Sequence, residues 1–222
     1  NLQVARERVV VVPNAVDLET LDTMVNGGAR RALRDSLGLS ETDPLLLSVG
    51  RIEENKGFQV LVEALARLAS DVESTARSRW HWALVGDGPN RPRLERAVRT
   101  AGLADRVTFA GRVDECELHA WYEAASLFVH PTLYEGSSLV TLEAMAHRRP
   151  VIATRAGGIP DKVTPGVSGW LVEPGDADAL AHAVGEALGA MNRVAGMGDA
   201  GRAIVEREFS WVTATDRLLD LY

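Results

Sequence analysis

Short apolar segments alternate with helical patterns along most of this chain, and this alternation limits the folds that the chain can adopt. Between the segments, apolar residues recur at three- and four-residue spacing, as Phe58, Leu61, Leu65 and Leu68 do. Strands that alternate with helices form a parallel, doubly wound sheet with right-handed crossovers. We therefore predict an α/β fold with a helical segment from Gly175 to the chain end, and with strands at residues 9–12, 45–50, 82–86, 107–111, 126–130, 150–154 and 170–172.

Ligands of such sheets bind beyond the carboxyl ends of the strands, and the loop after residues 126–130 is the most informative one there. The helix expected after this loop presents free backbone N–H groups and a positive dipole end, which together make an anion site. Glu135 lies in the loop, and Glu143 is the only charge between Gly136 and Ala146. Eight residues correspond to a rotation of roughly 80° and a rise of about 12 Å, so both carboxylates can line one pocket. This suits a ligand with phosphates and hydroxyls. The simpler alternative is that Glu135 favours the helix dipole and Glu143 is a solvated charge.

A second polar loop follows the strand expected at residues 45–50. Gly50 permits a tight exit from the strand, and Gly57 opens the next helix, so Arg51 and Lys56 are expected close together at the strand end. A guanidinium binds two phosphate oxygens at once, and an ammonium adds a point charge. The pair is therefore a candidate phosphate site, with ordinary surface charges as the alternative.

The Glu135-x7-Glu143 spacing, together with the Arg51 and Lys56 loop, resembles the retaining glycosyltransferases of the GT-B fold, the "group 1" family 4. The matching motifs occur in family order from about Val9 to Leu188. This chain has E-G-S-S-L where many relatives have E-G-F-G-L, so Ser138 stands where a glycine allows a very close backbone approach. It also has P-N-A-V-D at residues 13–17 where the family has P-N-G-V-D.

The resemblance implies a role for each matching residue. Arg51, Lys56 and Glu135 form the catalytic set: the two cations stabilise the nucleoside-diphosphate leaving group, and Glu135 accepts hydrogen bonds from the donor sugar. Glu143 accepts hydrogen bonds from the ribose. Backbone groups complete the donor site, at the strand-end turns Gly50 and Gly86, at the nucleobase edge beside Arg112 and Val113, and at the helix start formed by Gly136, Ser137, Ser138, Leu139 and Val140. His130 is the histidine nearest to this site, and a structural role is expected for it.

The resemblance also implies a reaction. Residues 1–222 correspond to the C-terminal, nucleotide-sugar-binding domain of a hexosyltransferase-like enzyme that transfers a sugar to an acceptor with retention at the anomeric carbon. The chain begins at Asn1 without Met, and we expect the N-terminal acceptor domain to be missing, so this fragment alone should be inactive. The alternatives are a non-catalytic nucleotide-sugar-binding module and a GT-B sugar-nucleotide epimerase. The expected partners are the nucleotide-sugar donor, an unidentified acceptor and the missing domain.

No metal or other cofactor is expected, because Arg51, Lys56 and a helix end replace a divalent ion at the leaving group. The Asp-x-Asp at residues 176–178 reads as a helix start instead. Gly196, Gly198 and Gly201 have the spacing of a dinucleotide fingerprint, but no strand precedes them, so we set that motif aside.

Composition excludes several further classes of protein. The formal net charge is −7 and no basic block occurs, which argues against a nucleic-acid partner. Cys116 is the single cysteine, which rules out an intrachain disulfide and CxxC sites. No apolar run approaches the ~20 residues of a transmembrane helix. We expect a cytoplasmic protein, with any membrane association made through the missing domain.

Overall fold

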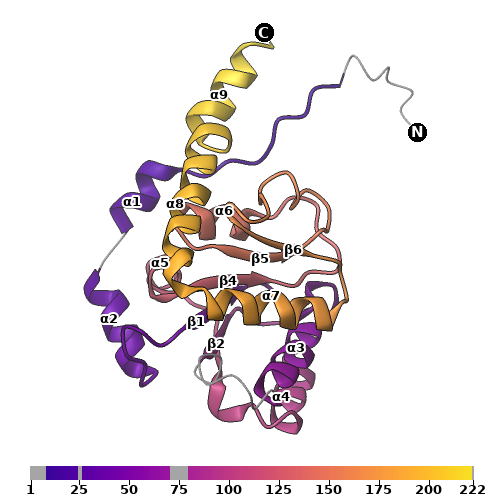
Figure 1. Cartoon of the computed structure of the whole chain (residues 1–222). Helices are drawn as coiled ribbons and strands as arrows, with labels where there is room; N and C mark the ends of the chain where they lie inside the picture. Colours follow the sequence, from indigo (N-terminus) through magenta and orange to yellow (C-terminus); the bar gives the residue numbers. More distant parts are fainter. Residues whose placement is uncertain (1–8, 25–26, 71–79, 222) are drawn as a thin grey trace.

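A computed structural model describes residues 9–24, 27–70 and 80–221 of the chain. At its centre lies a β-sheet (Figure 1). The sheet has six strands in the order β3-β2-β1-β4-β5-β6. Every neighbouring pair of strands is parallel. The strands are β1 Leu45–Val49, β2 His81–Val85, β3 Val107–Gly111, β4 Leu127–His130, β5 Val151–Thr154 and β6 Gly169–Val172. The predicted doubly wound α/β fold is therefore confirmed.

The strand order determines where a ligand can bind. From β1 the chain winds outward through β2 to β3, then returns to β4 beside β1 and winds outward again through β5 to β6. The order reverses between β1 and β4, and the loops that leave these two strands diverge around a crevice. These are the two loops in which the sequence predicts phosphate-binding groups.

Helices cover both faces of the sheet (Figure 1). Because β1 and β4 are buried along their whole length, alternate side chains enter two separate cores. Leu46, Trp82 and Val129 pack under one group of helices, and Leu45, Leu47 and Phe128 pack under the other. The first group comprises α3 Phe58–Ser70, α4 Arg91–Thr100 and α7 Ala177–Gly189; the second comprises α1 Leu18–Met24, α2 Gly27–Ser36, α5 Glu115–Ala124 and α6 Leu139–Ala146, with much of α8 Met191–Glu208.

The C-terminal segment is helical, as predicted: α7 and α8 are followed by α9 Trp211–Leu219. Gly198 lies inside α8, where an added Cβ atom would stand 2.0 Å from the carbonyl oxygen of Arg148. The glycines of the apparent fingerprint therefore belong to a helix, and this one allows α8 to pack against the chain beyond α6. No helix in the described ranges is long and apolar enough to cross a membrane.

The strand predicted at residues 9–12 is wrong. These residues form no strand, and Val9, Val10 and Val11 are 56%, 59% and 82% exposed. An apolar, β-branched run becomes a strand only where it finds a partner, because strand preference depends mainly on context. Here the backbone pairs only a few residues later, where Val16 N donates to Phe209 O at 2.9 Å beside the start of α9.

Candidate functional site

The loops that follow β1 and β4 are joined at the point where the strand order reverses. Leu133 N donates to the carbonyl oxygen of Asn55 at 2.7 Å, and the Thr132 hydroxyl donates to the same oxygen at 3.0 Å. Gly57 has φ +67°, and a Cβ atom on it would stand 2.0 Å from the Pro131 carbonyl oxygen. Only glycine permits this approach, which brings the preceding residue, Lys56, up to the second loop.

Lys56 and Glu135 meet across the two loops. The Lys56 ammonium lies 2.7 Å from Glu135 Oε2, and the two side chains are only 20% and 15% exposed. The structure thus brings together two of the three residues of the predicted catalytic set. The third, Arg51, comes from the same loop as Lys56, but its guanidinium is 67% exposed and pairs with Glu53 at 2.9 Å.

His130 also contacts Glu135. Its Nε2 atom lies 3.3 Å from Glu135 Oε2 and 3.4 Å from the Ser138 hydroxyl, and the ring is 1% exposed. Burial lowers the pKa of His130 and favours the neutral ring; because a carboxylate only accepts hydrogen bonds, the contact with Glu135 places a ring proton on Nε2. The His130 hydrogen bond and the Lys56 ammonium together lower the pKa of Glu135 to about 2. Glu135 is therefore held as a carboxylate.

The start of α6 lies directly after Glu135. Ser138 is the N-cap residue, and its hydroxyl accepts from Thr141 N at 3.3 Å. Gly136, Ser137 and Leu139 are exposed, and the first turn of α6 carries no charged side chain. The start of α6 is thus exposed and carries no charge of its own, and the anion site expected there stays a prediction.

A third loop, after β5, also contacts the segment that leads into α6. Gly158 N donates to the Gly136 carbonyl oxygen at 3.1 Å, and the Lys162 ammonium donates to the Ser137 hydroxyl at 3.1 Å. Lys162 is 4% exposed, and burial lowers its pKa. The sequence analysis did not select Lys162. It is a third cation next to the predicted phosphate-binding loop.

Glu143 lies one turn further along α6 and faces α5. The buried Tyr122 hydroxyl donates to Glu143 Oε2 at 2.8 Å. Burial raises the pKa of Glu143, and the Tyr122 hydrogen bond opposes this rise. Glu143 is thus a half-buried, oriented carboxylate, and the solvated alternative is wrong.

Five predicted donor-site residues line one cavity of about 380 Å³ at the ends of β1, β2 and β3: Gly50, Arg51, Gly86, Arg112 and Val113. Gly86 has φ +129°, and a Cβ atom on it would stand 2.0 Å from the Gly50 carbonyl oxygen. Glycine is therefore needed where these strand ends approach each other. A larger cavity of about 620 Å³ lies between α3 and α4, and none of the predicted donor-site residues lines it.

The Asp-x-Asp motif starts a helix, as predicted. The Asp176 carboxylate accepts from Ala179 N at 2.8 Å, and Asp178 pairs with Arg67 at 2.8 Å. Across residues 9–24, 27–70 and 80–221, no group of three or more His, Cys, Asp or Glu side chains is arranged to hold a metal ion.

The sequence and the structure of this chain are similar to those of known proteins. The family model described as glycosyl transferases group 1 matches residues 43–190. The D-inositol 3-phosphate glycosyltransferase of Xylanimonas cellulosilytica is 36% identical over 97% of this chain and 51% of its own length. The chain spans about half the length of the curated relatives it matches.

Solved structures resemble the fold over nearly the whole chain. The Anabaena protein HepE in complex with UDP matches 98% of this chain and 58% of its own, with a TM-score of 0.84 and 25% identity. The C-terminal domain of LpcC, a glycosyl transferase group 1 family protein from Francisella tularensis, matches 88% of this chain and 99% of its own, with a TM-score of 0.73 and 25% identity.

Proposed function

Because the chain belongs to the glycosyl transferases group 1 family, we propose that it is the donor-binding domain of an enzyme that transfers a sugar from a nucleotide sugar to an acceptor. The observation that carries this proposal is the contact between Lys56 and Glu135 at the reversal of the strand order, beside the open start of α6. A cation, a carboxylate and free backbone N–H groups at one point match a ligand that has both a diphosphate and sugar hydroxyls.

Each part of the donor then has a binding group. The nucleobase enters the cavity between Gly50, Gly86 and Val113. Glu143 accepts hydrogen bonds from the ribose. Lys56 and Arg51 bind the diphosphate, together with the backbone of residues 136–140. Glu135 accepts hydrogen bonds from the sugar.

The chemistry follows from charge. When the bond between the anomeric carbon and the diphosphate breaks, negative charge grows on the leaving oxygen. Cations and N–H groups that are already in position stabilise this charge without reorganisation. A new bond forms between the anomeric carbon and an acceptor oxygen, and the proton of the acceptor hydroxyl passes to an oxygen of the departing diphosphate. We propose that the configuration at the anomeric carbon is retained, by the resemblance of the motifs to retaining enzymes.

We further propose that a second, N-terminal domain supplies the acceptor site. The relatives are about twice as long as this chain. Apolar side chains lie exposed on α9 and near residues 9–11, among them Trp211 at 60%, Val212 at 72% and Leu219 at 67%. Such a surface fits an interface with another domain. Holding the acceptor beside the anomeric carbon contributes several kcal/mol, which one half of a cleft does not provide. The cytoplasmic location stays a prediction.

A transfer assay tests this proposal. We expect residues 1–222 to bind the donor without transferring the sugar, and the longer enzyme that contains them to transfer it with retention, as NMR of the product would report. Because Arg51, Lys56 and the α6 start already neutralise the diphosphate, we expect EDTA to leave this transfer unchanged. Robust transfer by residues 1–222 alone, an inverted product, or activity lost in EDTA and restored by Mg²⁺ or Mn²⁺ would contradict the corresponding part of the proposal.

A further inference from the structure

Tyr122 on α5 is the residue that orients Glu143. The side chain is completely buried, with its hydroxyl 2.8 Å from Glu143 Oε2 and 3.4 Å from the carbonyl oxygen of Val140. Burial raises the pKa of the Tyr122 phenol well above its ordinary range, so the hydroxyl keeps its proton and acts as a donor. One oxygen of the Glu143 carboxylate is therefore engaged from behind, by a group that a ligand cannot reach.

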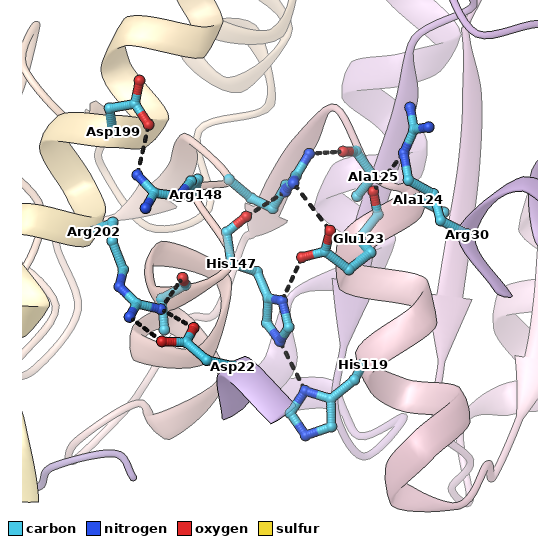
Figure 2. A network of polar contacts seen from close by, with 12 residues as sticks. Asp22, Arg30, His119, Glu123, Ala124, Ala125, His147, Arg148, Asp199 and Arg202 are labelled. Atoms are coloured by element: carbon cyan, nitrogen blue, oxygen red, sulfur yellow. Dashed lines mark hydrogen bonds and ion pairs between the residues drawn. The ribbon is translucent and has the colours of Figure 1, made fainter. Parts of the chain in front are cut away.

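Tyr122 is itself held in place by a polar network between α5 and the end of α6. Its ring stacks on the His147 ring, with the centroids 5.2 Å apart and the planes 9° from parallel. His147 lies between Glu123 and His119 (Figure 2), with Nδ1 2.7 Å from Glu123 Oε1 and Nε2 2.7 Å from His119 Nδ1. A ring fixed on both nitrogens gives the tyrosine a rigid support.

We propose that Tyr122 is a positioning residue for nucleotide recognition: its hydroxyl fixes Glu143 Oε2 so that the other carboxylate oxygen meets the ribose hydroxyls of a nucleoside diphosphate. This inference rests on the proposed function, because it assigns Glu143 to the ribose. It adds a residue that never touches the ligand. A carboxylate that is oriented in advance loses less side-chain freedom when the ribose binds.

The test removes only the hydroxyl. Tyr122→Phe keeps the ring that packs on His147 and on Phe128, whose centroid lies 5.8 Å away. Titration calorimetry then measures the affinity of the parent and of the variant for a ribonucleoside diphosphate and for its 2′,3′-dideoxy analogue. We expect the parent to prefer the ribonucleotide. In Tyr122→Phe we expect ribonucleotide affinity to fall at least about ten-fold and affinity for the dideoxy analogue to stay within about two-fold.

Ser48→Ala is the matched control for the loss of a buried hydroxyl. The Ser48 hydroxyl donates to the Val129 carbonyl oxygen at 2.7 Å and accepts from Trp82 Nε1, so its removal breaks buried hydrogen bonds within the sheet without touching Glu143. We expect Ser48→Ala to lower stability toward urea and to preserve the preference for ribose.

The pH dependence of binding gives a second readout that a purely structural role would not change. The groups that face Glu143 are Tyr122 and Glu115 from α5 and His147 from the end of α6. Because the Tyr122 hydrogen bond lowers the pKa of Glu143, Tyr122→Phe should raise it and shift the acid limb of ribonucleotide binding to higher pH. The ligand's own phosphate groups also gain or lose protons with pH, but this effect is the same for both proteins and cancels in the ratio of their affinities.

The outcomes distinguish the ribose site itself from the role of Tyr122 in that site. A parent that binds no nucleoside diphosphate, or that does not distinguish ribose from dideoxyribose, overturns the proposed ribose site and the role of Tyr122 with it. If the parent prefers ribose and Tyr122→Phe shows the same preference and the same acid limb, the role of Tyr122 alone is overturned.

Discussion

Lys56 and Glu135 form an ion pair in this structure, although the proposed function assigns the ammonium to the diphosphate and the carboxylate to the sugar. The ammonium and the carboxylate are 2.7 Å apart, and His130 supports the carboxylate from the buried side. When the donor binds, we therefore expect the Lys56 ammonium to turn to the diphosphate and the Glu135 carboxylate to accept hydrogen bonds from the sugar. Burial lowers the pKa of His130 and so disfavours a positive charge on the ring, which contacts Glu135 through a hydrogen bond.

This cluster makes a prediction about protonation. The pKa of Glu135 is about 2 in the folded protein against 4.5 as the ordinary value, so its stabilising contribution is present above about pH 4.5 and is lost as the pH falls toward 2. Lys56→Met should raise the pKa of Glu135 by about 1 unit, since it removes the ammonium and leaves the His130 hydrogen bond, which is the largest cause of the lowered pKa. Carboxyl ¹³C NMR titration measures the shift. Arg67→Met, which removes one side of the exposed pair with Asp178, is the control. An unchanged Glu135 pKa in Lys56→Met would show that the ion pair does not form in solution.

At the scale of elements, the loop after β5 determines where the loop before α6 can lie. Gly157 has φ +52°, and a Cβ atom on it would stand 1.5 Å from the Glu135 carbonyl oxygen. The neighbouring Gly158 donates to the Gly136 carbonyl oxygen. Glu135 is thus supported by a segment that contributes no residue to the predicted site.

We predict that Gly157→Ala destabilises the protein by more than Gly166→Ala. Both glycines have positive φ, which costs an alanine about 1–2 kcal/mol. Gly166 has φ +74° and nothing within 4 Å of an added Cβ atom, whereas Gly157 also meets backbone, and overpacking adds about 1–3 kcal/mol. Urea denaturation of the two variants measures the difference. Equal losses would mean that the loop after β5 yields freely and does not support Glu135.

The strands were predictable because a parallel strand that is buried on both faces is a short apolar run, which β1, β2 and β4 are in sequence and in structure. Residues 9–12 have the same composition, yet the described sheet has no partner for them. A single segment does not carry information about its partner. Sequence patterns identify strand candidates, and the pairing decides among them.

In the candidate site too, some residues could be predicted from the sequence and others only from the fold. Motif spacing selected Lys56, Glu135 and Glu143, since each lies in a loop or helix that follows a strand. It missed the supporting role of Tyr122, which reads as one more apolar position on α5, and Lys162, an ordinary lysine in a loop after β5. Both act through contacts between elements distant in the sequence, Tyr122 with Glu143 and Lys162 with Ser137. Only the fold reveals such contacts.

At the scale of the whole molecule, the proposed donor site spans three regions that the fold brings together at the carboxyl ends of the strands. The loops after β1 and β4 supply Lys56 and Glu135, the ends of β1, β2 and β3 enclose a cavity of about 380 Å³, and α6 adds its open end. Because all of these lie within this chain, donor binding should not require the rest of the enzyme.

Titration calorimetry of residues 1–222 with UDP, GDP, ADP and dTDP measures whether this chain binds a nucleoside diphosphate by itself. We predict that at least one of them binds, and that Lys56→Ala weakens the tightest by about 1.5–3 kcal/mol, roughly 10- to 150-fold. Arg67→Ala, which removes a cation from the exposed side of α3, should leave that affinity unchanged. Absence of binding by all four ligands, or equal affinity in the parent and in Lys56→Ala, would contradict the account.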